Sequence, residues 1–87
     1  MATDVKTPSG FECRVEEEAL DDMELMEDLV AIDKGDLSVL PAMTLRLLGQ
    51  EQKQRLYEHL RIKGRVPITA VANEIGNIIG ALKSKKN

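Results

Sequence analysis

The stretch ITAVANEIGNIIGALK, residues 68–83, indicates a helical fold. Its apolar side chains recur every three or four residues, which places them along one side of a helix of about 3.6 residues per turn. They are Ile68, Val71, Ala72, Ile75, Ile78, Ile79 and Leu82. This continuous stripe predicts a helix from Ile68 or Thr69 to Lys83 whose apolar side lies in the protein core.

Two glycines, Gly76 and Gly80, border this stripe one helical turn apart. A glycine inside a helix costs about 1 kcal/mol relative to alanine. The missing side chain allows another group to approach the backbone closely. We therefore predict that a partner contacts the helix at these two positions.

A second helix is predicted within ALDDMELMEDLVAIDKGD, residues 19–36. Asp21 or Asp22 can accept hydrogen bonds from the N–H groups of the first turn, and the acid charge suits the positive end of a helix. Gly35, which follows Lys34, is typical of the residue that ends a helix. Acids lie along one side of this predicted helix, and apolar residues spread over about half of its circumference.

That apolar face is wider than the stripe that an ordinary surface helix needs. One flank holds Leu25, Leu29 and Ile32, and the other holds Met23, Met26 and Val30. We expect the two leucines to lie in the core and the second flank to face a partner. Methionine is also a common core filler, which leaves that alternative open for the methionines here and for Met43.

The N-terminal segment predicts a small β-hairpin or an extended arm over residues 5–15. Pro8, Ser9 and Gly10 form a turn signal. The following FECRV alternates apolar and charged residues, which is the period of a strand with one buried face. An isolated hairpin is marginally stable in water, so we expect this one to pack on the helices.

Two more helices are predicted between these segments. One covers about residues 38–48, with Ser38 as its cap and Pro41 in its first turn. The other covers about residues 50–62 and ends where KGRVP, residues 63–67, breaks the pattern.

The length and composition agree with a small helical protein. At 87 residues the chain is near the lower limit for a self-sufficient core, and it contains one Phe, one Tyr and no Trp. The predicted fold class is mainly α: a compact bundle of about four short helices with a short N-terminal β-hairpin or extended arm. Residues 1–83 form the predicted domain, with helices over 16–83, and residues 84–87 form a basic tail.

The net charge of −3 hides an uneven distribution. Residues 1–36 hold three bases and twelve acids, whereas residues 37–87 hold nine bases and three acids. The two halves can lie against each other within the fold. Alternatively, the acidic half of one copy meets the basic half of another and gives a homo-oligomer, because complementary charge sets orientation and association rate.

The sequence offers little for catalysis or metal binding. A metal site would need a cluster of cysteines and histidines, and the chain has one of each, Cys13 and His59. The spacing of a calcium loop and that of a glycine-rich phosphate loop are both absent. We interpret His59 as a solvated surface residue and Cys13 as a small buried strand residue in a reducing compartment. We expect no enzyme, no metal and no cofactor.

Nucleic acid is an alternative partner, whereas a membrane is not indicated. The junction at Gly49 is similar to that of a helix-turn-helix, and six bases could form a basic face: Arg46, Lys53, Arg55, Arg61, Lys63 and Arg65. The acidic balance and the scarcity of aromatic residues argue against this alternative, a small helix-turn-helix DNA-binding regulator. A structural adaptor without a client is a second alternative. No apolar run is long enough to span a membrane, and the first residues lack the apolar core of a signal peptide.

Residues 7–61, TPSGFECRVEEEALDDMELMEDLVAIDKGDLSVLPAMTLRLLGQEQKQRLYEHLR, followed by GRVPITAVANEI at residues 64–75, form a recognisable series. This series resembles the small tail assembly chaperones of siphophages from Gram-positive hosts. The segments that carry the resemblance are TPSGF (7–11), ALDD (19–22), LLG (47–49), YEHL (57–60) and GRVP (64–67).

The resemblance implies a helical, non-enzymatic protein of the host cytoplasm, encoded by a bacteriophage or prophage. Such chaperones bind the long, apolar, helical tape measure protein and keep it soluble until tail tube subunits polymerise around it. The tape measure protein is therefore the expected partner, with the tail tube protein as a second candidate. Exposed apolar helix surface aggregates, and helix-in-groove contact is a natural way to cover it. The candidate partner-binding residues are Met23, Met26, Val30, Gly76 and Gly80.

Overall fold

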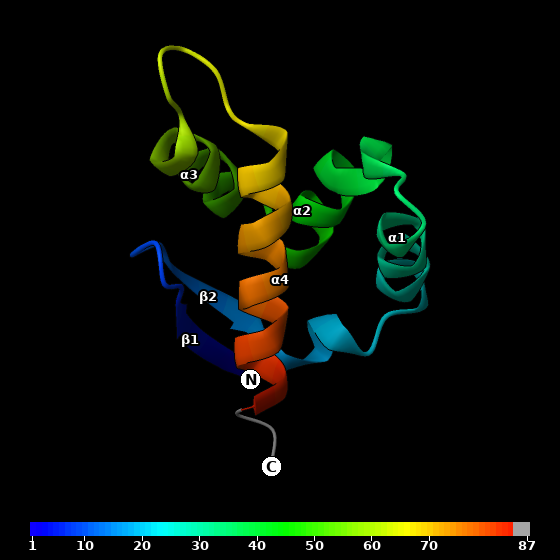
Figure 1. Cartoon of the computed structure of the whole chain (residues 1–87). Coiled ribbons are helices and arrows are strands. Elements are labelled where there is room, and N and C mark those ends of the chain that lie inside the picture. The colour runs from blue at the N-terminus through cyan, green and yellow to red at the C-terminus, as the bar shows by residue number, and fades with distance from the viewer. Residues whose placement is uncertain (85–87) are drawn as a thin grey trace.

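The protein is mainly helical, as predicted, with four α-helices and a two-stranded antiparallel hairpin (Figure 1). The structure is a computed structural model and describes residues 1–84. The helices are α1 (Met23–Asp33), α2 (Leu40–Leu48), α3 (Gln50–Leu60) and α4 (Ile68–Ser84), with short 3₁₀ turns at Glu17–Leu20 and Leu37–Val39. Ser84 belongs to α4, and the rest of the predicted basic tail lies outside the described residues.

The hairpin is longer than predicted. Strands β1 (Ala2–Lys6) and β2 (Glu12–Glu16) pair so that Val5 lies opposite Cys13. The two strands are joined by a turn in which Gly10 has a φ of +93°, a conformation that glycine adopts without strain. Alternate residues of β2 are buried, as the period of FECRV predicts.

The ends of α1 are confirmed. The Asp22 carboxylate accepts hydrogen bonds from two N–H groups of the first turn, which fixes the start of the helix. At the other end Gly35 has a φ of +90°. The N–H groups of Gly35 and of the next residue donate to the carbonyls of Ile32 and Ala31, both at 2.9 Å. This pair of hydrogen bonds is a Schellman motif, which satisfies carbonyls that the helix leaves unpaired.

The predicted start of the next helix was wrong. Ser38 does not cap it, because α2 begins at Leu40. The hydroxyl and the N–H of Ser38 instead donate to the Asp36 carboxylate, which lowers the pKa of Asp36 and closes the 3₁₀ turn. Pro41 lies in the first turn of α2, where its missing N–H does no harm.

Helix α3 ends two residues earlier than predicted, because the chain turns back sharply. Ile62 and Arg65 exchange backbone hydrogen bonds of 2.7 and 3.0 Å. Between them Lys63 and Gly64 have φ values of +52° and +82°. Positive φ at both central positions indicates a type I′ turn.

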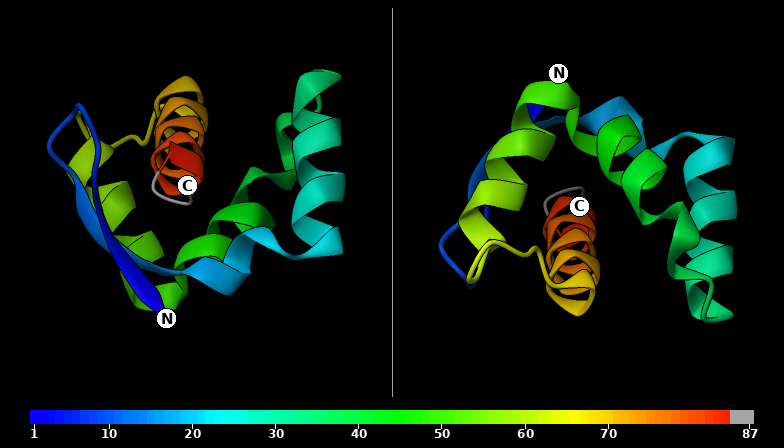
Figure 2. Two further views of the ribbon diagram at one scale, coloured as in Figure 1. Left: turned by 90° about the horizontal axis from the view of Figure 1, so that it is seen from below. Right: turned by 90° about the horizontal axis from the view of Figure 1, so that it is seen from above.

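The core is arranged around α4. This helix contacts β1, α3 and α2 (Figures 1 and 2). Its predicted stripe is confirmed at five buried positions: Val71, Ile75, Ile78, Ile79 and Leu82. Ile68 departs from the prediction, with an exposure of 60%, because it lies in the first turn before the helix reaches the core.

Helix α1 lies at the edge of the molecule, where it packs on α2 and the 3₁₀ turns (Figure 2). An ion-pair cluster joins it to α2. The Arg46 guanidinium lies within 4.0 Å of the carboxylates of Asp22, Glu24 and Asp28. Part of the acidic half therefore meets a base within the fold.

Arg46→Met is expected to loosen α1 and to lower the free energy of unfolding by about 1 kcal/mol, because three carboxylates lose their shared partner. Hydrogen exchange should show weaker protection of the α1 amides and little change in α4. Lys83→Met is the control, since it removes the same charge from the last turn of α4. Equal loosening of α1 in both variants would assign the effect to net charge rather than to the cluster.

Candidate functional site

An apolar ridge runs along the outer side of α1. Met23, Met26 and Val30 are 66%, 57% and 48% exposed. Their spacing of three and four residues places them on one side of the helix. These three side chains are called the α1 ridge below. Apolar side chains grouped in this way mark an interaction surface better than isolated exposed ones do.

The other flank of α1 faces inward. Leu25 is buried with 1% exposure, as expected for a core residue. Leu29 and Ile32 pack against the core, on the side expected, and are partly buried. The reason is the position of α1 at the edge, where α2 covers only part of its face. Met43, on α2, is buried, so the methionines divide between core and surface.

The α1 ridge has an acidic border. At about 100° per residue, Glu27 and Asp33 lie on either side of the ridge, and both are exposed. The helix itself contains no Lys or Arg, and one base, the C-cap Lys34, follows Val30 by one turn on the same side. A partner of α1 therefore meets apolar side chains between carboxylates, which favours a partner with bases beside its own apolar residues.

Gly76 and Gly80 lie on the exposed side of α4. A Cβ added at either position would meet nothing within 4 Å, so no other described segment of this chain packs closely there. The close approach predicted for these glycines is absent within residues 1–84. A partner molecule remains the predicted occupant. Figure 2 shows α2 between α4 and α1, so the glycines and the α1 ridge stand on separated helices.

The structure contains an apolar groove of about 380 Å³ that was not predicted from the sequence. The groove lies where the starts of α2 and α4 meet α3, and is called the α2–α4 groove below. It is lined by Leu37, Ser38, Leu40, Pro41, Tyr57, Val66, Ile68 and Val71. The sequence feature that could have indicated the groove is the apolar first turn of α4, because Ile68 begins the apolar stripe before the helix reaches the core.

Two segments next to the α2–α4 groove carry bases. The Lys53 ammonium lies 5.5 Å from the centre of the Tyr57 ring, which lines the groove. Lys63 and Arg65 are exposed on the type I′ turn that leads directly into Val66. One acid also lies at the edge, because the Asp36 carboxylate accepts hydrogen bonds from Ser38 of the lining. Bases still outnumber acids beside the groove, whereas acids outnumber bases beside the α1 ridge.

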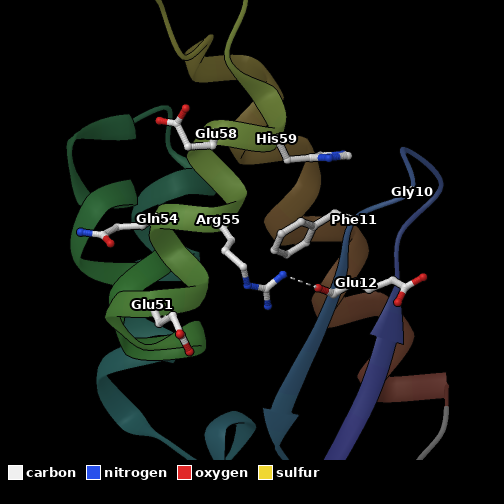
Figure 3. A pocket seen from close by; sticks show the side chains of 8 residues that line it. All are labelled: Gly10, Phe11, Glu12, Glu51, Gln54, Arg55, Glu58 and His59. Atoms are coloured by element: carbon white, nitrogen blue, oxygen red, sulfur yellow. Dashed lines mark hydrogen bonds between the residues drawn. The ribbon is translucent and has the colours of Figure 1, made fainter.

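A second hollow, of about 620 Å³, lies between the hairpin and α3 (Figure 3). His59 lies here and is exposed as expected, but it is not merely solvated. Its Nε2 lies 3.1 Å from the Ser9 hydroxyl, and its ring packs 5.5 Å from that of Phe11. The Arg55 guanidinium covers Phe11 at 5.4 Å and donates a hydrogen bond to the Glu12 carbonyl. These side chains attach the hairpin to α3.

The outer edge of β2 is paired by side chains of α3. Gln52 accepts a hydrogen bond from the Arg14 N–H at 2.7 Å and donates one to the Arg14 carbonyl at 2.8 Å. An amide side chain thus takes the place of a neighbouring strand. Pairing of this kind protects an edge that would otherwise pair with another chain.

Helix α3 does not present a basic surface. Figure 3 shows Glu51, Gln54 and Glu58 along the helix, while Arg55 turns toward the hairpin. The Glu58 carboxylate accepts hydrogen bonds from Arg61, which holds the pKa of Glu58 below its usual range. A helix that enters a DNA groove needs positive charge toward the phosphates, and these acids oppose it.

Two groups are buried where the hairpin packs on α4. Cys13 is buried as predicted, and burial raises the pKa of its thiol; the charge of Glu74 acts in the same direction and that of Arg55 against it. Such a thiol is a poor nucleophile at neutral pH. Glu74 itself, on α4, is buried, and its Oε1 has no hydrogen-bond partner within residues 1–84.

No group of three or more metal-binding side chains is assembled among residues 1–84. Within the same residues no helix is long and apolar enough to cross a membrane. Comparison of the chain with protein-family models, with curated proteins and with solved structures found no match.

Proposed function

We propose that this protein is a tail assembly chaperone of a bacteriophage or prophage. It binds the tape measure protein in the host cytoplasm and keeps it soluble, without catalysis. The observation that carries the proposal is the α1 ridge, a set of exposed apolar side chains on a helix that is fixed at both ends. The sequence resemblance to the siphophage chaperones supports the same conclusion.

The α1 ridge suits a long helical client. An amphipathic helix that has not yet assembled exposes an apolar stripe, and a second apolar helix face can cover it. The two methionines adapt to different neighbouring side chains, because methionine is unbranched and polarizable. One such surface therefore fits successive segments of a long client whose sequence varies. The acidic border favours client segments that carry Lys or Arg beside the stripe.

Two features weigh against the alternative of a DNA-binding regulator. Three of the six bases considered for a basic face are engaged within the chain: Arg46 by α1 carboxylates, Arg55 by the hairpin and Arg61 by Glu58. The accessible surface of α3 carries Glu51 and Glu58. Binding to DNA relies on several neutralised phosphates, and this arrangement supplies few free bases for that purpose.

The test is co-expression with the tape measure protein of the same genome. The wild-type chain is expected to keep this client in the soluble fraction. Met26→Glu is expected to fold normally, because an exposed substitution changes stability by no more than about 0.5 kcal/mol. It should bind the client at least about tenfold more weakly, since central apolar contacts cost about 2 kcal/mol or more when lost.

Leu45→Glu is the matched control. Leu45 is an exposed apolar residue of α2 outside the α1 ridge, so the variant adds the same charge elsewhere. It should keep the client soluble. A client that stays insoluble with the wild-type chain would overturn the chaperone proposal. Equal loss in both variants would overturn the assignment of the contact to the α1 ridge.

A further inference from the structure

We infer that two copies of this chain bind each other head to tail, with the α1 ridge of one copy seated in the α2–α4 groove of the other. This inference goes beyond the proposed function, because it concerns the chain alone and needs no client. It is carried by two exposed apolar surfaces of opposite shape and opposite surrounding charge.

The shapes are complementary. The ridge is three side chains on about two turns of one helix, which is the usual form of a helix that enters a groove. The groove is a hollow of about 380 Å³ with an apolar lining. Ile68, at its edge, is 60% exposed, as expected for a residue that lacks a covering neighbour. Methionine side chains adapt to the shape of such a hollow.

The charges select the head-to-tail arrangement. Glu27 and Asp33 border the ridge, which has one base, Lys34, at its end. Lys53, Lys63 and Arg65 lie on the segments next to the groove, which has one acid, Asp36, at its edge. A symmetric contact of ridge with ridge would place carboxylates against carboxylates. Contact of ridge with groove places them against bases instead, which favours this orientation and speeds encounter.

The occupant of the groove belongs to another copy. None of the three ridge side chains lines the groove of its own chain. Helix α1 is held on α2 by the Arg46 cluster, so the ridge is directed away from the protein core that the groove adjoins. Each copy then offers one ridge and one groove. A contact between two different surfaces continues into longer rows, or closes into a ring, rather than stopping at a dimer.

The same ridge cannot hold a neighbouring copy and a client helix at once. Self-association therefore covers the exposed methionines of a chain that has no client. Taken with the proposed function, a client helix would displace the neighbouring copy from the ridge. The test below uses the chain alone, so its failure leaves the proposed function standing.

The test is sedimentation velocity on the full chain over a concentration series at low salt. The wild-type chain is expected to increase in mass with concentration. Met26→Glu blocks only the ridge and Ile68→Glu blocks only the groove, so each variant alone should associate at least about tenfold more weakly. Ile68 lies in the first turn of α4, where an added acid is compatible with the helix. Circular dichroism verifies that both variants fold.

Mixing the two variants gives the decisive result. Met26→Glu keeps its groove and Ile68→Glu keeps its ridge, so an equimolar mixture should form a one-to-one dimer and nothing larger. Leu45→Glu should associate as the wild-type chain does. Association should weaken as salt rises, because exposed charges are screened over about 10 Å at 0.1 M.

Three results would overturn the inference. The first is a wild-type chain that stays monomeric at every concentration. The second is an Ile68→Glu variant that associates normally, which would remove the groove from the contact. The third is a mixture of the two variants that stays monomeric, which would show that ridge and groove are not complementary surfaces.

Discussion

Leu56→Ala is expected to lower the free energy of unfolding by about 2–5 kcal/mol, because the substitution opens a cavity as well as removing buried apolar surface. Leu56 has an exposure of 0%, and its helix α3 packs on both α2 and α4. A domain of this size has a total stability of roughly 5–10 kcal/mol. The variant should therefore lose a large share of its stability and unfold at a clearly lower urea concentration than the wild-type chain.

Urea titration followed by circular dichroism measures this loss. Leu60→Ala is the matched control: it makes the same substitution one turn later on α3, at a residue that is only partly buried. It should lose clearly less stability. Equal losses in the two variants would contradict the conclusion that Leu56 anchors α3. Helix α3 also holds the hairpin through Gln52 and Arg55, so loss of its anchor should release both elements together.

The helices could be predicted because their signals are local. The stripe of α4 has a period that only a helix provides, and the start and end of α1 depend on one aspartate and one glycine. In each case the deciding interaction joins residues within five positions of each other. Such interactions are nearly independent of the rest of the fold, so the sequence alone is sufficient to find them.

The remaining features depend on residues that are distant in sequence. Gln52 pairs with Arg14 across 38 positions, and no local pattern marks a glutamine that completes a strand edge. Glu74 is buried on α4, which packs against the hairpin and α3. The residues next to Glu74 in sequence do not mark it as a buried acid. The α2–α4 groove likewise requires three helices to be placed first.

The candidate site was found only in part for the same reason. The spread of apolar residues on α1 indicated a second contact surface, and the exposed ridge lies on the predicted flank. Sequence could not decide whether the two charged halves meet within one chain or between copies. In the structure Arg46 forms ion pairs with α1 carboxylates of the same chain. Lys63 and Arg65 lie on a separate turn.

Replacement of both glycines of α4 by alanine, Gly76→Ala with Gly80→Ala, is expected to raise the free energy of unfolding by about 1 kcal/mol at each position, or about 2 kcal/mol together. Alanine restricts the unfolded chain more than glycine does, and an exposed helical position accepts its Cβ. Neither added Cβ would meet an atom within 4 Å, so no steric cost offsets this gain. Urea titration measures the change.

The same double variant tests whether a partner contacts α4 at the two glycines. If a client backbone packs against α4, two added methyl groups hold it away, and the more stable variant should keep less of the tape measure protein in solution. Asn77→Ala is the control, because it also improves helix propensity on an exposed side of α4 but fills no gap left by a glycine. It should be slightly more stable than the wild-type chain and hold its client equally well. A double variant that is both more stable and fully active would show that the glycines contact no partner, and that the α1 ridge alone accounts for binding.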